Sequence, residues 1–386
     1  MINDIASIRY FLYFASTMIY RTLGKTGLSV SSLGMGTMRL PLGGNGSGQC
    51  HAEALIRHAA DRGINYFDTA GFYCGGRCES VTGGVLTTIP QDSLIWSAKN
   101  SAHQGREKKW TDQLDRSLSC FRRECLDIYW IHYITLAQWH QYFLDEGHIE
   151  ELTASKNAGK FLFLGFSSHD TPEHVRRLID MDIFDAILLP FNVLNTVYRP
   201  VMEYATGKGM GVLAMNPLSG GTLARSGLTA GDTAPEIPAH ALTGLALQYV
   251  LSQPFIHCVL SGMDSHDVID LNVAAVAAPR MTAGDMRRLE ARIQASRLTR
   301  GQPCTGCGYC LPCPQGISVP DIISLYNRFI ILETESVTDR DFMALEKNSE
   351  CCIACGICEN RCPNHIPVAT IMKEMNALCS GRPSNG

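Results

Sequence analysis

The sequence predicts a TIM-type (β/α)8 barrel followed by a small C-terminal α-helical domain. Two observations lead to this prediction. From about residue 50 to residue 295, short apolar runs alternate with helical patterns. Alternation over this length is typical of a closed barrel of parallel strands rather than an open sheet. After residue 303, eight cysteines fall into two closely spaced runs, and the segment between the runs is largely helical in pattern.

Each predicted strand is an apolar run of about the length of a fully buried strand. The runs lie at residues 31–36, 64–68, 94–100, 126–132, 160–168, 184–190, 211–217 and 256–262. A last helix at residues 282–296 ends the barrel, and a linker then leads into the cysteine region. We therefore expect a tail at residues 1–18, a barrel at 19–296 and a ferredoxin-type domain at 297–386.

Glycines mark the ends of two helices between these strands. The helical pattern at residues 52–63 ends on Gly63, and the pattern at residues 148–158 is followed by Gly159. Glycine readily adopts the left-handed conformation that closes many helices. These positions therefore separate helix from strand in the predicted order.

The composition limits the classes of function. The chain has 386 residues, 45% of them hydrophobic, which is enough for one large domain and one small one. Its net charge of −4 lacks the basic footprint of nucleic-acid-binding proteins. No apolar run reaches the ~20 residues that cross a bilayer, so we expect no membrane partner. Sixteen cysteines in a chain this long suggest reduced thiols and metal ligation, and hence a cytoplasmic protein.

The two cysteine runs predict two 4Fe–4S clusters. The expected ligands are Cys304, Cys307, Cys310, Cys313, Cys352, Cys355, Cys358 and Cys362. The second run has the spacing of bacterial ferredoxins, in which the fourth cysteine stands before proline and ligates the other cluster. The long helical segment between the runs favours a helical ferredoxin module over the compact βαβ type.

Three points about the cysteines stay open. The first run has two residues rather than three before its last cysteine, which leaves the placement of Cys313 open. Cys351 could compete with Cys352 as a ligand, although Cys352 keeps the regular interval. Two zinc sites with four thiolates each are the alternative to clusters, and the Cys-Pro endings argue against them.

Polar residues stand at or just beyond the ends of three successive predicted strands, where barrel enzymes carry their active sites. Asp68 closes one apolar run and Tyr73 follows on the loop, while Lys99 and His132 close the next two runs. Each alone is more simply a turn residue, a solvated strand end, a core histidine or a rim aromatic. Together and in this order they predict a catalytic site.

These residues resemble the catalytic tetrad of the aldo/keto reductases. The resemblance extends from the opening segment 20–40 to the runs at 160–170 and 214–221, and covers essentially the whole barrel, residues 19–295. With the appended cysteine runs, the chain is similar to members of that family that have a C-terminal 4Fe–4S ferredoxin domain. The resemblance implies a carbonyl or alcohol substrate and a nicotinamide cofactor. The implied cofactor contacts are Gly36, Thr37, Ser167, Ser168, Leu218, Gly262 and Asn272.

The resemblance also implies a role for each tetrad residue. A free tyrosine has a pKa of ~10, and a nearby ammonium lowers that value. Lys99 would supply this charge and Asp68 would hold Lys99 in place. His132 would orient the substrate carbonyl, and Tyr73 would protonate its oxygen as hydride arrives at carbon.

Several positions depart from the family pattern. Leu188 stands where a carboxamide-binding glutamine is usual, and Met215 where an aromatic residue stacks on nicotinamide. Gly262 and Val268 replace the Lys and Arg that pair the 2′-phosphate of NADPH, and the same segment carries two aspartates. We therefore expect NADH to be favoured over NADPH, with weak or absent nucleotide binding as the alternative.

One further cation lies near the expected barrel mouth. Arg39, just past the first strand, is a candidate to clamp a substrate carboxylate or phosphate. An ordinary surface ion pair explains this arginine equally well.

Three hypotheses account for a hydride site joined to one-electron clusters. The first is an oxidoreductase that exchanges electrons between an organic substrate and a ferredoxin-like partner, with nicotinamide or an unrecognised flavin splitting the electron pair. The second is an electron-transfer or redox-sensing protein whose barrel binds a metabolite or partner without hydride transfer. The third is an NADH-dependent reductase whose clusters are structural. The intact tetrad favours the first and third hypotheses, and the altered nucleotide positions favour the second.

Overall fold

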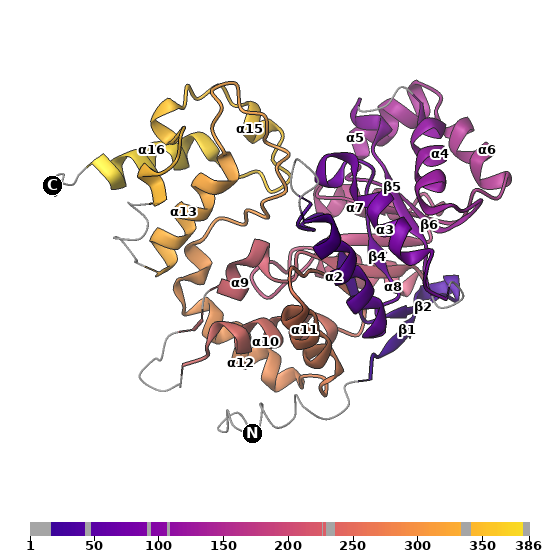
Figure 1. Ribbon diagram of the computed structural model, residues 1–386, viewed down its shortest axis with the longest axis horizontal. Coiled ribbons are helices and arrows are strands. Elements are labelled where there is room, and N and C mark those ends of the chain that lie inside the picture. The colour runs from indigo at the N-terminus through magenta and orange to yellow at the C-terminus, as the bar shows by residue number, and fades with distance from the viewer. Residues whose placement is uncertain are drawn as a thin grey trace. The chain divides into compact units, whose positions relative to one another are not determined.

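The larger part of the chain is a barrel of eight parallel strands. The computed structural model describes residues 17–42, 48–90, 94–105, 109–225, 227–228, 236–332 and 341–380. The strand order is β4–β3–β10–β9–β8–β7–β6–β5. A parallel bridge between Tyr66 and Ile95, just before the two outer strands, curls the sheet into a barrel (Figure 1). The predicted (β/α)8 fold is confirmed.

The strands are shorter than the apolar runs that predict them. They are β3 Leu33–Gly36, β4 Phe67–Asp68, β5 Ser97–Asn100, β6 Leu126–Ile131, β7 Phe161–Ser167, β8 Ala186–Pro190, β9 Gly211–Met215 and β10 Cys258–Gly262. The helices between and after them are α2 Gln49–Asp61, α3 Cys78–Leu86, α4 Trp110–Phe121, α5 Leu136–Gln138, α6 Ile149–Asn157, α7 Pro172–Ile179, α8 Arg199–Gly207, α9 Thr222–Arg225, α10 Ala239–Leu251 and α11 His266–Ala277. Each strand therefore alternates with at least one helix, as a (β/α)8 barrel requires.

A short hairpin closes the amino end of the barrel. Strands β1 Tyr20–Thr22 and β2 Ser29–Ser31 pair antiparallel. Leu23, in the turn between them, lies against Gly211 at the start of β9. Leu23 and Val30 belong to the same buried apolar cluster as side chains from the barrel strands. The amino end is therefore filled, and the carboxyl ends of the strands carry the polar residues.

The chain divides into two compact units, each described separately. The first comprises Met1–Pro217 and Gly244–Thr282, and the second comprises Leu218–Thr243 and Ala283–Gly386. Helix α12 Ala283–Gln294 and the segment after β9 therefore belong to the same compact unit as the cysteine region. Residues 1–16 of the expected tail lie outside the described residues.

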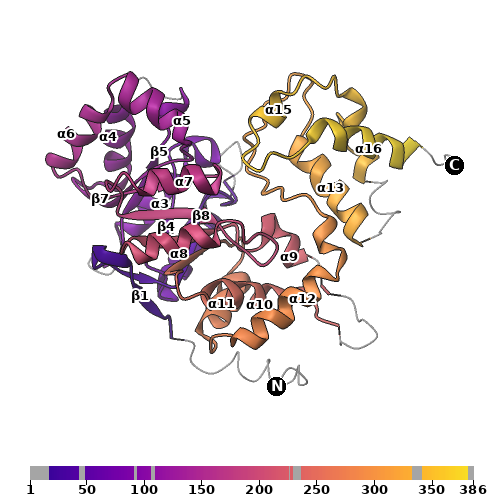
Figure 2. The same ribbon diagram turned by 180° about the vertical axis from the view of Figure 1, so that it is seen from behind.

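The second unit is helical, as the sequence predicts. Besides α12, it contains η7 Arg297–Arg300, α13 Val319–Leu332, η8 Ser349–Cys351, α15 Ile357–Asn360 and α16 Val368–Ser380. Helices α13 and α16 lie side by side (Figure 2). Ile322 and Met375 are fully buried between them. At the edge of this core Tyr326 donates a hydrogen bond to Glu374 at 2.5 Å. The apolar core holds the cysteine-bearing loops on a helical frame.

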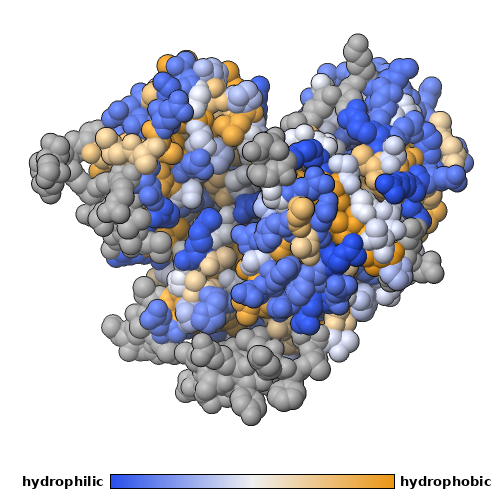
Figure 3. Space-filling model, in the orientation of Figure 1, coloured by the Kyte–Doolittle hydropathy of each residue, from blue (hydrophilic) through white to orange (hydrophobic). Residues whose placement is uncertain are grey.

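The surface mixes residue types. On the face shown in Figure 3, hydrophilic residues are interspersed with hydrophobic ones. Two exposed apolar side chains, Leu311 and Ile353, lie inside the two cysteine runs, and Ile353 is 61% exposed. Among the described helices, none has both the length and the apolarity that spanning a bilayer requires.

Candidate functional site

A buried ion pair lies at the carboxyl ends of strands β4 and β5. Asp68 is the last residue of β4, and Lys99 lies in β5. The Nζ atom of Lys99 donates to Oδ2 of Asp68 at 2.5 Å and to the carbonyl oxygen of Thr69 at 3.0 Å. Burial raises the pKa of Asp68 and lowers that of Lys99, and each partner's charge opposes the shift. The lysine is 2% exposed, so its charge depends on this pairing.

Tyr73 and His132 complete the group. The Oη atom of Tyr73 lies 3.5 Å from Nζ of Lys99 and 3.4 Å from Nε2 of His132. Both rings are buried. The structure therefore brings all four predicted tetrad residues together, with the phenol between an ammonium and an imidazole.

The loop after β4 positions the phenol. Tyr73 begins the short helix η2 Tyr73–Gly76, in which Cys74, Gly75 and Gly76 all have positive φ. Phe72 packs on both partners, since its ring centroid lies 5.1 Å from that of Tyr73 and 5.1 Å from that of His132. Phe72 was not among the residues predicted from the sequence. Its position beside the tyrosine in a glycine-rich loop was the available signal.

Polar residues of α3 and α4 form hydrogen bonds next to the tetrad. Gln113 donates to the carbonyl oxygen of Lys99 at 3.3 Å and accepts from the backbone N–H of Ser101 at 2.8 Å. Ser117 donates to the carboxylate of Glu79 at 3.1 Å. Burial raises the pKa of Glu79 to about 7, while the hydrogen bond from Ser117 and the charge of Lys99 oppose the rise. The signal for Gln113 and Ser117 was polarity on the otherwise apolar face of α4.

The expected cofactor and substrate residues at the ends of β3 and β10, and in the segments that follow these strands, lie together. Gly36 and Gly262 are direct neighbours in the parallel register of these strands. Thr37 donates to the carbonyl oxygen of Asp68 through both its backbone N–H and its hydroxyl, at 3.0 and 2.9 Å. Arg39 is exposed, and its Cδ lies 3.8 Å from where a Cβ on Gly262 would be. Nearby, buried Asn272 donates to the hydroxyl of Ser261 at 3.2 Å.

The two predicted serines bond to the loop that follows His132. The Oγ of Ser167 accepts from the backbone N–H of Tyr133 at 2.8 Å. The hydroxyl of Ser168 donates to the carbonyl oxygen of Ile134 at 2.7 Å and accepts from the backbone N–H of Asp170 at 3.0 Å. Both hydroxyls therefore tie the end of β7 to the loop after β6.

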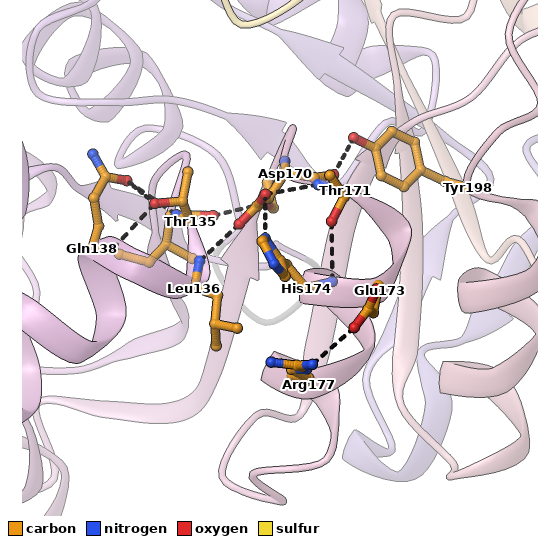
Figure 4. Close-up of polar contacts among 11 residues, drawn as sticks. Thr135, Leu136, Gln138, Asp170, Thr171, Glu173, His174, Arg177 and Tyr198 are labelled. Atoms are coloured by element: carbon orange, nitrogen blue, oxygen red, sulfur yellow. Dashed lines mark hydrogen bonds and ion pairs between the residues drawn. The ribbon is translucent and has the colours of Figure 1, made fainter.

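Asp170 strengthens the same connection. Its carboxylate accepts from the backbone N–H of Leu136 at 2.9 Å and lies 2.9 Å from Nδ1 of His174. Figure 4 shows Asp170 between the loop at Leu136 and helix α7, with Tyr198 donating to its carbonyl oxygen. The loop that follows His132 is therefore held by a network of backbone and side-chain hydrogen bonds.

Three further positions expected near the cofactor differ in their surroundings. Leu188 is fully buried in the apolar cluster inside the barrel, and Met215 packs against the same cluster. Leu218 belongs to the second compact unit, just before η6 Ser219–Gly221.

The two cysteine runs have matching backbones. In the first run, Gly306 and Gly308 flank Cys307 and both have positive φ. In the second run, Ala354 and Gly356 hold the same places around Cys355, again with positive φ. The two loops therefore share the same left-handed backbone around their second cysteine.

One pocket collects thiols from both runs. It is lined by Cys313, Cys352, Cys355 and Cys358, together with the apolar side chains Ile317, Val319, Val368 and Met372. The last cysteine of the first run therefore joins the first three cysteines of the second. Cys352 lines the pocket, and its Sγ accepts from the backbone N–H of Ala354 at 3.4 Å; Cys351 is not part of the lining.

The remaining four cysteines are close enough to interact electrostatically. Burial and the neighbouring thiols of Cys307, Cys304 and Cys362 raise the pKa of Cys310 to about 12. Asn364, two residues after Cys362, donates to the carbonyl oxygen of Pro303 at 2.7 Å. Four thiols with apolar walls fit a 4Fe–4S cluster. In the described part of the chain no three His, Cys, Asp or Glu side chains converge closely enough for a single ion, so the fit rests on the pocket lining.

The fold and the polar group define a barrel enzyme with a cluster-binding helical unit. The chain belongs to the aldo/keto reductase family, whose model matches residues 32–243. A model of a 4Fe–4S dicluster domain matches residues 303–367. The chain is therefore an oxidoreductase of the aldo/keto reductase type, with 4Fe–4S clusters among its cofactors.

Individual relatives agree with this assignment. L-galactose dehydrogenase of Arabidopsis thaliana is 31% identical over 284 residues, which are 66% of this chain and 87% of the relative. Pyridoxal 4-dehydrogenase of Microbacterium luteolum is 44% identical over 77 residues, 19% of this chain and 22% of the relative. The holo form of aldo-keto reductase AKR11C1 from Bacillus halodurans matches with a TM-score of 0.60 at 25% identity, covering 71% of this chain and 96% of that one.

Proposed function

We propose that the protein interconverts a small-molecule carbonyl and its alcohol at the tetrad, and that its two clusters link this reaction to single-electron transfer. The observation that carries the proposal is the approach of the Tyr73 phenol to within 3.5 Å of the Lys99 ammonium. An adjacent positive charge favours the phenolate, so the phenol can give up its proton near neutral pH. Asp68, at 2.5 Å, keeps that ammonium in place.

Each residue has a definite task in the proposed reaction. In the reducing direction, His132 donates a hydrogen bond to the carbonyl oxygen and orients it, and Tyr73 transfers its Oη proton to that oxygen. Phe72 packs on the rings of Tyr73 and His132 and fixes their positions relative to each other. In the oxidising direction the same phenol oxygen takes the proton back. When bound, a nicotinamide supplies the hydride chemistry.

For the nucleotide we propose contacts from Gly36, Thr37, Ser167, Ser168, Leu218, Gly262 and Asn272, and a preference for NADH over NADPH. The segment after β10 carries the exposed carboxylates Asp264 and Asp267. Asp267 lies in the first turn of α11, whose cap is Ser265. These charges repel the 2′-phosphate of NADPH, which a Lys or Arg would attract.

For the substrate we propose a polar carbonyl compound with an anionic group held by Arg39. Arg39 is exposed, and its Cδ atom lies beside Gly262, where β3 and β10 end. The relatives' names indicate action on a sugar and on an aromatic aldehyde, L-galactose and pyridoxal. Phosphorylated or carboxylated aldoses and aromatic aldehydes are therefore the first compounds to assay.

For the clusters we propose two mixed ligand sets. Cys352, Cys355, Cys358 and Cys313 would hold one cluster, and Cys304, Cys307, Cys310 and Cys362 the other. When bound, the clusters supply single-electron transfer. Leu311 and Ile353 expose apolar surface within the two ligand runs, which supports docking of a ferredoxin-like electron partner there. Sixteen cysteines without a disulfide support a reducing compartment, and we propose the cytoplasm.

A redox-sensing protein without hydride transfer is the second candidate. The burial of Leu188 and the packing of Met215 on the barrel core favour it, because these apolar side chains offer no polar or aromatic contact to a nicotinamide ring. Absence of NADH and NADPH binding to the intact protein would support this candidate.

The first test compares wild type with Tyr73→Phe in oxygen-free holoprotein. Wild type should reduce members of the aldehyde panel with NADH faster than with NADPH. Removing the phenol oxygen should lower kcat at least 100-fold, since general acid catalysis contributes about 10²–10⁴-fold. NADH affinity should stay unchanged, because the ring remains. Equal kcat for both proteins would rule out the proposed role of Tyr73.

A further inference from the structure

Two cysteines lie side by side next to the proposed catalytic tyrosine. Cys74 follows Tyr73 in η2, and Cys78 is the first residue of α3. Their Sγ atoms are 2.8 Å apart, with Cys78 donating to Cys74. A disulfide has its sulfurs about 2.05 Å apart, so a small movement would bring these two to bonding distance. The tetrad chemistry uses neither thiol.

The two thiols differ in access. Cys78 is fully buried, whereas Cys74 is partly exposed. Backbone carbonyls surround the pair: the Sγ of Cys78 lies 3.0 Å from the carbonyl oxygen of Thr37, and the Sγ of Cys74 lies 3.4 Å from the carbonyl oxygen of Met38. The hydrogen bond from Cys78 lowers the pKa of Cys74, while burial opposes it. The accessible thiol is therefore the more easily ionised of the two, as in pairs with one attacking and one resolving cysteine.

We propose that Cys74 and Cys78 form a reversible dithiol–disulfide site that reacts with low-molecular-weight disulfides, and that its oxidation lowers turnover at the tetrad. Formation of the bond is independent of the proposed function, whereas the effect on turnover rests on it.

The exchange balances in two steps. The thiolate of Cys74 attacks one sulfur of a disulfide RSSR, which forms a mixed disulfide and releases RS⁻, protonated to RSH. The thiolate of Cys78 then attacks the Cys74 sulfur and releases the second RS⁻. The two protein thiols lose two protons and two electrons in total, and RSSR becomes two RSH.

Oxidation would act on the tetrad through two connections. Cys74 is bonded to Tyr73 and has φ of 51°, so a shift of its sulfur toward Cys78 moves the loop that carries the phenol. Bond formation also removes the S–H group of Cys78, whose sulfur lies 3.0 Å from the carbonyl oxygen of Thr37, a residue that itself donates to the carbonyl of Asp68. Misplacing a reacting group by 1 Å can cost about 100-fold in rate.

The test uses oxygen-free holoprotein treated with oxidised glutathione, while visible absorption confirms that the clusters stay intact. Free thiols are then alkylated and the protein is digested with trypsin. Arg77 lies between the two cysteines, so a Cys74–Cys78 disulfide joins peptide 63–77 to peptide 78–99. We expect this linked pair in treated protein and its separation by dithiothreitol. Full alkylation of both cysteines after treatment would overturn the site.

Matched variants test the formation of the Cys74–Cys78 disulfide and its effect on turnover separately. Cys125→Ser removes a partly buried thiol outside the tetrad, and should keep both the linked pair and the loss of turnover. Cys74→Ser should lose the linked pair and show the same turnover before and after treatment, whatever its starting rate. Cys78→Ser should also lose the linked pair, and its Cys74 should stop at the mixed disulfide with glutathione. In wild type, turnover should fall at least tenfold and recover on reduction. A linked pair with unchanged turnover would overturn the regulatory effect, and peptide analysis decides on the site even if no carbonyl is turned over.

Discussion

The Nζ atom of Lys99 lies 2.5 Å from Oδ2 of Asp68, and both residues are buried. An ion pair in such a place is held by mutual compensation, because each charge alone would be costly to keep away from water. The same ammonium reaches the phenol oxygen of Tyr73. Stability and the proposed proton transfer therefore depend on one contact.

Replacing one partner of the Asp68–Lys99 ion pair should destabilise the protein more than replacing both partners together. Asp68→Asn and Lys99→Met should each destabilise the protein by about 3–5 kcal/mol, since an uncompensated buried charge or polar group remains. The double variant should be less destabilised than the sum of the singles. Thermal unfolding of the four oxygen-free proteins measures this coupling, and strictly additive effects would show that the pair does not interact.

Glu79 should make stability depend on pH. Burial raises its pKa from 4.5 to about 7. Between these values the folded state holds a proton that the unfolded state has released. The stability that the protonated Glu79 carboxyl contributes to the folded state is thus fully present below about pH 4.5. It is lost as the pH rises through about 7. Glu79→Gln, neutral throughout, should gain on the order of 2 kcal/mol over wild type between pH 5.5 and 8.

Thermal midpoints of wild type and Glu79→Gln at both pH values measure this gain. Glu53→Gln, at a partly exposed position in α2, is the control and should show no such change. A constant difference between Glu79→Gln and wild type would mean that Glu79 ionises normally.

Iron content should reveal which cysteines share a cluster. Each single change Cys313→Ala, Cys352→Ala or Cys304→Ala should remove about half of the iron, because each breaks one of two clusters. Cys313 and Cys352 line the same pocket, so their double variant should lose no more than either single. The double variant of Cys313 and Cys304 should lose nearly all of the iron. The opposite pattern would assign Cys313 to the cluster of its own run.

Gly220 should be needed for the first cluster loop. A Cβ on this residue would lie 1.9 Å from the carbonyl oxygen of Cys304, and its φ is 68°. Gly159 has a φ of 73° with nothing within 4 Å of its Cβ position. Gly159→Ala therefore carries the backbone strain alone, whereas Gly220→Ala must also displace Cys304. Iron should fall by up to half in Gly220→Ala only; equal iron in both variants would show that the loop tolerates the displacement.

Much of the fold was accessible from the sequence, because buried parallel strands leave apolar runs and glycines mark helix ends. Asp68, Lys99 and His132 were accessible for the same reason, since each stands where such a run ends. Their convergence with Tyr73 follows from barrel geometry once the strands are ordered.

Contacts between distant segments were not accessible. Gln113 and Ser117 support the tetrad only because α4 packs behind it, and Phe72 because the loop folds over His132. The grouping of residues 218–243 with the cysteine region depends on contacts such as that of Gly220 with Cys304, which lie far apart in sequence. The nucleotide contacts, Arg39 and the expected domain boundaries stay predictions.

The central claim is that a hydride site and single-electron clusters in this chain exchange electrons. The most direct measurement adds NADH to oxygen-free holoprotein and follows nicotinamide absorption and visible cluster absorption in the same cuvette. We predict that NADH is consumed while the cluster absorption bleaches. Reduction of a carbonyl substrate by NADH with no change in cluster absorption, before or during turnover, would contradict the claim.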